Sequence, residues 1–169
     1  MERHVLSILV ENHVGVLSRV SGLFSRRGYN IESLSVGVTE DPVFSRITVV
    51  VMGDVNIIEQ IRKQVEKLVD AVEVIVLLPD ESVYRELTLI KVRANAKERP
   101  EIVGIVEIFR ANIIDVAIDS MTVELTGDQD KADAFRELMA PYGVIEIVRT
   151  GLTAIQRGNV ALKDQEVKW

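Results

Sequence analysis

The spacing of hydrophobic residues changes several times along the first half of the chain, and each change marks an expected element. Residues 4–10 are apolar at alternate positions, which predicts a strand, whereas from Val16 the apolar positions recur every three or four residues, which predicts a helix. Gly28 is expected to end that helix, because glycine readily takes the left-handed conformation found just past a helix C-terminus. The later elements expected in this half are a hairpin of strands 30–39 and 44–52 around the turn Glu40-Asp41-Pro42, a helix after the N-cap Asp54, and a strand at 72–78.

The same order of elements recurs in the second half. The elements expected there are a strand at 86–94, a helix opened by Pro100, a hairpin of strands 113–118 and 121–126, a helix at 131–139 and a strand at 144–149. With right-handed crossovers, each half gives a four-stranded antiparallel sheet with two helices on one face. We therefore predict an α+β protein of two ferredoxin-like (βαββαβ) sandwiches in tandem.

The predicted domain boundaries follow from the same pattern. The first domain is expected at 1–79, a charged linker at 80–85 and the second domain at 86–169. Residues 151–169 are polar and have no period, so they form either a tail or a segment that orders against a partner. The first strand is apolar on both faces, because Val5 and Leu9 alternate with the other apolar residues, and this predicts a partner on the face or edge that the helices leave open.

Composition narrows the classes of function. The chain has 169 residues, of which 47% are hydrophobic, and this suits two small cores. A formal charge of -6 argues against nucleic acid, which is bound through clustered Lys and Arg. The absence of cysteine excludes disulfides, thiolate metal sites and cysteine nucleophiles. No stretch has the pattern of a targeting signal or a membrane span, so a cytoplasmic protein with no membrane partner is expected.

Candidate binding residues flank the first helix of the first half. Gly15 opens this helix without a Cβ, so a ligand can approach the free N–H groups of the first turn, which favour a carboxylate. Asn12 and Asn30 offer amide groups to an ammonium or a carboxylate, and apolar neighbours would line a small pocket. The candidate effector-binding residues are Asn12, Val14, Gly15, Val16, Leu17, Asn30 and Ile31. A free branched-chain amino acid meets these requirements.

Simpler interpretations stay open for the same residues. Asn12 would cap the helix and Gly15 would serve a tight turn, and spacing alone favours this interpretation because caps are common. His13 is expected to be an exposed loop residue, since no second ligand stands at metal spacing, and no metal site is predicted. Asp128 and Asp130 are expected at a helix N-terminus as cap and dipole partner and not as cation ligands. No set of residues suggests catalysis, so no catalytic residue is predicted.

Several runs of residues are shared with one known family. The most specific is Gly28-Tyr29-Asn30-Ile31-Glu32-Ser33-Leu34. Further shared runs are Ser7-Ile8-Leu9-Val10-Glu11-Asn12, Gly15-Val16-Leu17-Ser18-Arg19-Val20, Glu107-Ile108-Phe109-Arg110-Ala111, Ile114-Asp115-Val116 and Arg157-Gly158. With these runs the chain resembles the small, regulatory subunit of acetohydroxyacid synthase (acetolactate synthase) over almost its whole length.

The resemblance implies an N-terminal ACT domain, which senses amino acids, and a second domain of similar topology. It implies a non-catalytic subunit, with no cofactor of its own, that binds and activates a catalytic (large) subunit using thiamine diphosphate, Mg and FAD. It also implies feedback inhibition by valine or a related branched-chain amino acid, with effector contacts at Asn12, Gly15, Val16, Asn30 and Ile31 between two ACT domains. Since the two candidate segments flank one helix at opposite ends, the walls of the site are expected to come from the two subunits of a homodimer.

Two other classes remain. One is a stand-alone ACT-type amino-acid sensor or adaptor with a different partner, and the other is an enzyme in its own right. Co-purification with a thiamine-diphosphate enzyme distinguishes the regulatory subunit from the adaptor, and turnover by the isolated chain would indicate the enzyme.

Overall fold

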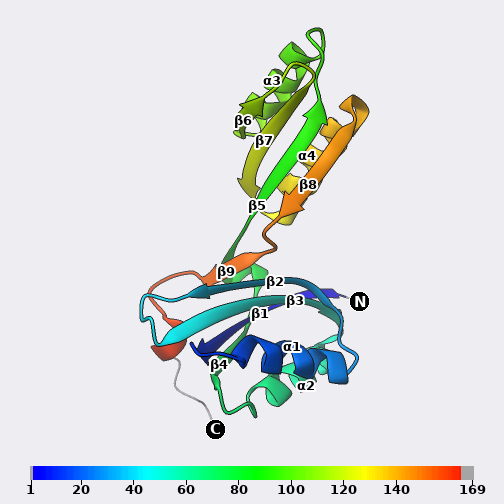
Figure 1. The fold of residues 1–169 in the computed structure, drawn as a ribbon. Helices are drawn as coiled ribbons and strands as arrows, with labels where there is room; N and C mark the ends of the chain where they lie inside the picture. The colour runs from blue at the N-terminus through cyan, green and yellow to red at the C-terminus, as the bar shows by residue number, and fades with distance from the viewer. Residues whose placement is uncertain (1, 165–169) are drawn as a thin grey trace. The chain divides into compact units, whose positions relative to one another are not determined.

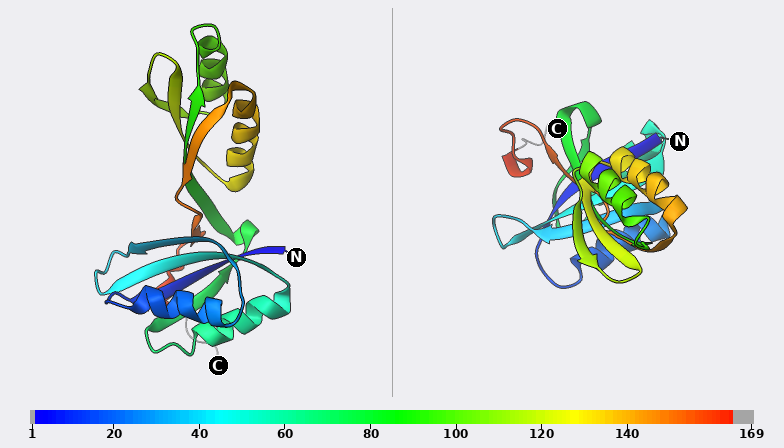
Figure 2. Two further views of the ribbon diagram at one scale, coloured as in Figure 1. Left: turned by 45° about the vertical axis from the view of Figure 1, so that its right-hand side comes forward. Right: turned by 90° about the horizontal axis from the view of Figure 1, so that it is seen from above.

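The computed structural model describes residues 2–164, which form two compact units (Figure 1). The first unit contains residues up to 84 together with those from 152 onward, and the second contains residues 85–151. Both units combine an antiparallel sheet with helices packed on one face, as the views in Figure 2 also show. The predicted α+β class with two ferredoxin-like sandwiches is confirmed.

The first unit has its strands in the order β2-β3-β1-β4. Its elements are β1 (Glu2–Glu11), α1 (Val16–Arg26), β2 (Ile31–Val38), β3 (Phe44–Gly53), α2 (Val55–Val65), β4 (Ala71–Leu77) and the short 3₁₀ helices η1 (Pro79–Glu81) and η3 (Leu162–Asp164). Their bounds follow the expected periodicities closely, because the apolar stripes of α1 and α2 both face the sheet. The buried core between them consists of Leu6, Ile8, Val10, Val16, Val20, Leu23, Phe24, Ile47, Val49, Val51, Ile58, Ile61, Val65 and Val74.

Helix termini in this unit follow the expected local chemistry. Gly28 has a φ of 71°, the left-handed conformation that was predicted for it after α1. The Asp54 side chain accepts a hydrogen bond from the Ile57 N–H at 2.9 Å and so caps α2 as predicted.

The second face of the first sheet is covered by residues that follow the second unit in sequence. Leu152 and Ala154 are buried there together with Val5, Val50 and Leu77. Strand β9 (Thr153–Gln156) pairs with β5, and the Ser35 hydroxyl donates to the Leu152 carbonyl at 3.1 Å. The apolar second face of β1 therefore packs against another part of the same chain, a different outcome from the expected partner.

These contacts change the division of the chain. The sequence placed residues 151–169 in the second domain as a polar tail, whereas residues 152–164 pack with the first unit because Leu152, Ala154 and Leu162 are buried. The expected linker at 80–85 is also shorter in structure, since η1 occupies its start and β5 (Ser82–Arg93) already begins at Ser82. The expected tail residues 165–169 lie outside the described part of the chain.

The second unit has its strands in the order β6-β7-β5-β8. Its further elements are α3 (Arg99–Ile108), β6 (Asn112–Val116), β7 (Ser120–Gly127), α4 (Gln129–Met139), the 3₁₀ helix η2 (Ala140–Tyr142) and β8 (Val144–Arg149). Its buried core consists of Ile90, Val92, Ala94, Ile102, Val106, Met121, Val123, Leu125, Ala132, Phe135 and Met139. At one end of the sheet the buried carboxylate of Glu86 accepts from the Arg149 guanidinium at 2.7 and 3.0 Å.

No helix among the described residues is long and apolar enough to cross a membrane.

Candidate functional site

The N-terminus of α1 is an open helix start. Gly15 is its N-cap residue with φ 92° and ψ −12°, and no side chain caps the helix. Val16 N–H reaches the His13 carbonyl only at 3.4 Å, and the N–H groups of Leu17 and Ser18 have no acceptor among the described residues. A Cβ at Gly15 would meet nothing within 4 Å, so the surroundings of Gly15 are open. Unpaired N–H groups at the positive end of a helix favour an anion such as a carboxylate.

Asn12 has a different role from the helix cap that spacing favoured. Its Nδ2 donates to the Pro42 carbonyl at 2.9 Å, and its backbone N–H donates to the Val43 carbonyl at 2.7 Å. Asn12 therefore fastens the loop before α1 to the turn between β2 and β3, and the capping interpretation is wrong. The first turn of α1 stays uncapped because its nearest amide side chain is bound elsewhere.

The three apolar candidates next to Gly15 separate into two groups. Val14 and Leu17 face solvent, with 98% and 42% of their surface exposed. Val16 is buried in the core below α1 and anchors the helix start from beneath. Val14 therefore places exposed apolar surface beside the N–H groups that have no acceptor among the described residues.

Asn30 and Ile31 lie at the opposite end of α1, just after Gly28. Asn30 is exposed, and Ile31 is half-buried at the start of β2, where it pairs with Val51 and packs on the core. The helix between the two segments has 11 residues and is therefore about 16 Å long. One small amino acid cannot contact both segments of the same chain.

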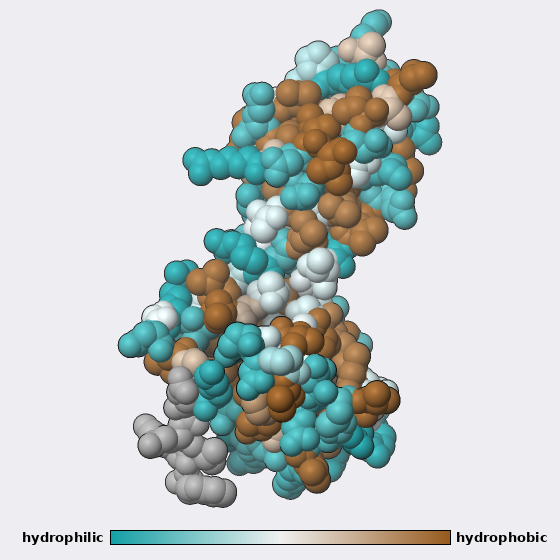
Figure 3. Space-filling model, turned by 60° about the vertical axis from the view of Figure 1, so that its left-hand side comes forward, coloured by the Kyte–Doolittle hydropathy of each residue, from teal (hydrophilic) through white to brown (hydrophobic). Residues whose placement is uncertain are grey.

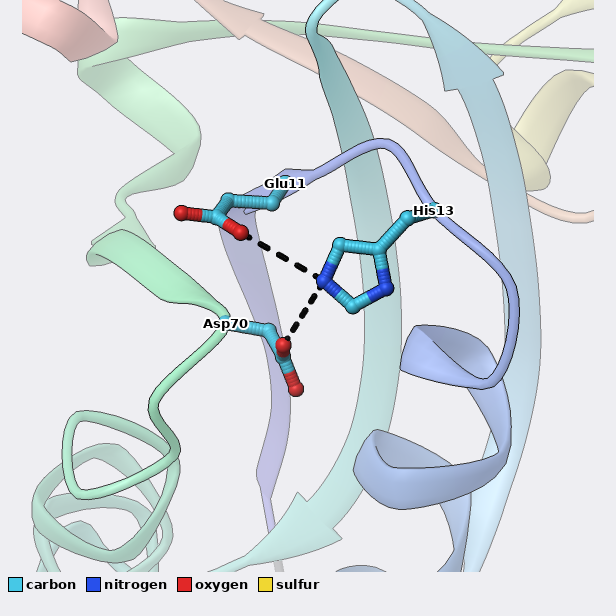
Figure 4. A group of neighbouring side chains, drawn as sticks. All are labelled: Glu11, His13 and Asp70. Carbon is cyan, nitrogen blue, oxygen red and sulfur yellow. Dashed lines mark ion pairs between the residues drawn. The ribbon is translucent and has the colours of Figure 1, made fainter.

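Sequence reasoning missed a cluster of charged side chains beside this loop. His13 Nε2 lies 2.9 Å from Asp70 Oδ1 and 3.4 Å from Glu11 Oε2 (Figure 4). Arg19 Nε contacts the second Asp70 oxygen, Oδ2, at 2.6 Å. His13 is exposed as expected, but the prediction that it has no neighbouring ligand group is wrong. Glu11 stands only two residues before His13, but spacing along the chain gave no signal for Asp70, which belongs to the connection before β4.

Two further polar side chains, Asp128 and Ser21, have local roles. The Asp128 carboxylate accepts from the Lys131 N–H at 2.9 Å and caps α4, as predicted. Ser21, one of the serines spaced along α1, donates to the Leu17 carbonyl of its own helix at 2.8 Å.

Hydrophobic side chains are exposed on the second unit near its edge strand β6. Figure 3, which turns this side of the unit toward the reader, shows hydrophobic residues gathered on its surface. The exposed apolar residues around β6 and the end of α3 are Ile108, Ile113, Ile114, Val116 and Ile118. This is apolar surface of the kind found at protein–protein interfaces.

Each of the two units matches a known protein family. Residues 6–73 match the family described as AHAS small subunit-like ACT domain, and residues 85–158 match the family described as small subunit of acetolactate synthase. A probable acetolactate synthase small subunit of Archaeoglobus fulgidus is 52% identical over 157 residues, which are 93% of this chain and 98% of the relative. The chain belongs to the acetolactate synthase small-subunit family. Its first unit is an ACT domain.

Further members of the family agree over the same length. The acetolactate synthase small subunit of Mycobacterium leprae is 49% identical over 155 residues, which are 92% of each chain. The crystal structure of the small subunit from Thermotoga maritima is similar with a TM-score of 0.87 and 46% identity, covering 95% of this chain and 100% of that one.

Proposed function

We propose that this chain is a non-catalytic, homodimeric subunit that activates its thiamine-diphosphate-dependent catalytic partner and makes it sensitive to valine or a related branched-chain amino acid. The large subunit would hold thiamine diphosphate, Mg and FAD, and the small subunit would hold only the effector. The observation that carries the proposal is the uncapped start of α1 in an ACT domain of this family, where the N–H groups of Leu17 and Ser18 have no partner in the described part of the chain.

The effector carboxylate would accept hydrogen bonds from these two N–H groups. The close approach of the carboxylate requires the missing Cβ of Gly15, whose surroundings are open. The apolar side chain of the effector would lie against Val14 and Leu17, which are exposed and stand on either side of Gly15. A bound amino acid would therefore remove apolar surface from water and pair two free donors at once.

Dimerisation would complete the site. Asn30 and Ile31 cannot reach the ligand from their own chain, because α1 separates them from Gly15. Strand β2, at whose start they lie, is the edge strand of the first sheet, and its Val36 and Val38 are exposed. Pairing of two such edges would satisfy unpaired backbone groups and bring residues of one chain toward the loop of the other.

Regulation then follows from linkage. A ligand held between two chains stabilises the dimer arrangement that closes on it, and it affects the catalytic partner only by binding two arrangements with different affinity. The exposed hydrophobic residues around β6 are available for contact with another subunit.

The first test is the substitution Gly15→Asp. It places a carboxylate beside the ligand carboxylate, and like charges brought together cost a few kcal/mol, so the valine Kd should rise by about 100-fold. Gly15→Asn is the matched control, since it has nearly the same volume and the same left-handed backbone requirement but no charge. Calorimetry should show a much larger loss for the aspartate variant than for the asparagine variant. Unchanged valine affinity in Gly15→Asp would place the effector elsewhere.

The second test concerns the partner. Acetolactate synthase activity of the catalytic subunit should rise when this chain is added, and valine, leucine or isoleucine should then reduce it. If the chain binds valine but neither binds nor affects the catalytic subunit, it is an amino-acid sensor with another partner.

A further inference from the structure

The cluster of Glu11, His13 and Asp70 brings three metal-ligating groups together on the first unit. Glu11 ends β1, His13 lies in the loop before α1, and Asp70 lies just before β4. Figure 4 shows the imidazole edge of His13 directed toward both carboxylates. One potential ligand atom from each residue lies within 4.8 Å of the other two.

The separations of the ligand atoms suit a bound ion. Around an ion with bonds of about 2.0–2.2 Å, neighbouring ligand atoms are about 2.9–3.5 Å apart for octahedral and tetrahedral geometry. His13 Nε2 is already 2.9 Å from Asp70 Oδ1 and 3.4 Å from Glu11 Oε2. The exposed Glu11 side chain has the freedom to bring its oxygen into the same shell.

The ligands are held by further contacts. The Glu11 N–H donates to the Asp70 carbonyl at 3.0 Å, which fixes the two backbones against each other. His13 Nδ1 lies 3.2 Å from the Val14 carbonyl, to which it can donate, and this leaves Nε2 for a metal. The Arg19 guanidinium contacts both oxygens of Asp70, Oδ2 through Nε at 2.6 Å and Oδ1 through Nη2 at 3.2 Å, and so fixes the carboxylate with Oδ1 also near His13. Contacts of this kind, which orient metal ligands from behind, are typical of metal sites.

The charge of the cluster also favours a cation. Two carboxylates outweigh the one guanidinium of Arg19, so the charged groups around the His13 ring are negative overall. One imidazole nitrogen and two carboxylate oxygens suit zinc and neighbouring divalent transition metals, whereas Mg²⁺ and Ca²⁺ prefer oxygen ligands alone. Glu11 and His13 face solvent, so water can fill the remaining positions.

We propose that Glu11, His13 and Asp70 bind a divalent transition-metal ion of the zinc class. Figure 4 shows the three side chains already in contact, with His13 Nε2 close to a carboxylate oxygen of each acidic residue. Because Glu11 and His13 stand on either side of Asn12, and Val14 and Gly15 follow, the ion would fix the loop from which we propose the effector is bound. That consequence rests on the proposed function, whereas metal binding itself does not.

The test is calorimetric titration of the full-length protein with Zn²⁺ and, in parallel, with Mg²⁺. We expect saturable binding of one Zn²⁺ per chain at this site and no comparable binding of Mg²⁺. His13→Ala should weaken Zn²⁺ binding by at least about 100-fold, since even contacts that only orient ligands are worth 10–100-fold. Asp70→Asn should weaken it in the same direction.

The control uses the other of the two histidines in the chain. His4 lies on β1, and its Nε2 is 4.0 Å from Glu2, so it belongs to a different part of the strand. His4→Gln should bind Zn²⁺ like the unsubstituted protein, and circular dichroism should show that the His13 and Asp70 variants remain folded. The proposal is overturned if Zn²⁺ does not bind, if Mg²⁺ binds equally well, or if His13→Ala binds Zn²⁺ undiminished.

A second measurement separates this proposal from the function proposed above. Valine is titrated with and without Zn²⁺, and a loop fixed by the ion should bind valine with a different Kd. Zn²⁺ binding that His13→Ala removes supports the metal site whether or not valine binds, so failure of the effector site and failure of the metal site give different results.

Discussion

The two units share one topology but differ at the start of their first helix. Both have the strand order second, third, first, fourth within their own set, and in both the loop in question joins the first strand to the first helix. In the first unit the N–H groups of Leu17 and Ser18 have no acceptor within residues 2–164. In the second unit the helix start is closed by its own loop.

The closure in the second unit uses backbone and side chains together. Arg99 N–H donates to the Asn95 carbonyl, Glu101 N–H and Ile102 N–H donate to the Glu98 carbonyl, and Pro100 has no N–H to satisfy. The Asn95 side chain also accepts from the N–H groups of Lys97 and Glu98. The same fold therefore leaves the N–H groups at this helix start without partners among the described residues in the first unit and hydrogen-bonded in the second. Where a ligand can bind depends on the residues of the loop and not on the fold.

The largest expected effect tests whether the two units fold separately. Phe24 and Phe135 are both fully buried, one in each core, and replacing either by Ala should lower the free energy of unfolding by about 3–5 kcal/mol. Urea denaturation measures this loss. Valine calorimetry on the two variants then sharpens the comparison, because only Phe24→Ala damages the core beneath α1. Loss of valine binding in Phe135→Ala would show that the first unit depends on the second.

A second change makes the first helix start resemble the second. Leu17 occupies the position in α1 that Pro100 occupies in α3, and Leu17→Pro removes one unpaired N–H without breaking a hydrogen bond. A hydrogen bond to a charged group contributes about 1.5–3 kcal/mol, so the valine Kd should rise by about 10–100-fold. Pro100→Leu is the matched change in the second unit and should leave valine binding as it is. If the two variants bind valine with equal affinity, the Leu17 N–H does not contact the effector.

The smallest expected effect concerns the N-cap of the second helix, which has the same hydrogen bond in both units. Asp54 and Asp128 cap the second helix of their units. The carboxylate of each accepts a hydrogen bond from the backbone N–H of the residue three positions later, at 2.9 Å in both cases. Replacing either by Ala should cost about 1 kcal/mol of stability, and neither change should alter valine affinity. Urea denaturation of the two single variants tests this equivalence. A markedly larger loss in one of them would show that its cap does more than end a helix.

Much of the fold was predictable because its signals are local. Apolar residues stand at alternate positions before Val16 and at every third or fourth position from Val16 on, and this spacing shows which side of each strand or helix is apolar. The observed helices and strands lie close to the ranges expected from it. Gly28 and Asp128 act as predicted because left-handed backbone and N-capping depend on the residue and its nearest neighbours.

The candidate site was predictable only in part. The open start of α1 could be expected from Gly15, but spacing alone favoured Asn12 as its cap over an effector contact, because a short polar residue before a helix is most often a cap. In the structure the Asn12 side-chain amide donates instead to the carbonyl of Pro42, which lies 30 residues further along the chain. Val16 was also a candidate for the pocket, whereas the structure buries it in the core, as its place in the apolar spacing of the helix allows.

By itself the sequence determined the order of the helices and strands, the recurrence of that order in both halves, and the family. It could do so because periodicity and short motifs are properties of neighbouring residues. Only the tertiary structure decided that Leu152 and Ala154 cover the second face of the first sheet, and that Asp70 meets His13. These contacts join residues far apart in the chain. They depend on where each strand lies in the sheet and which face it turns outward, and no local pattern carries that information.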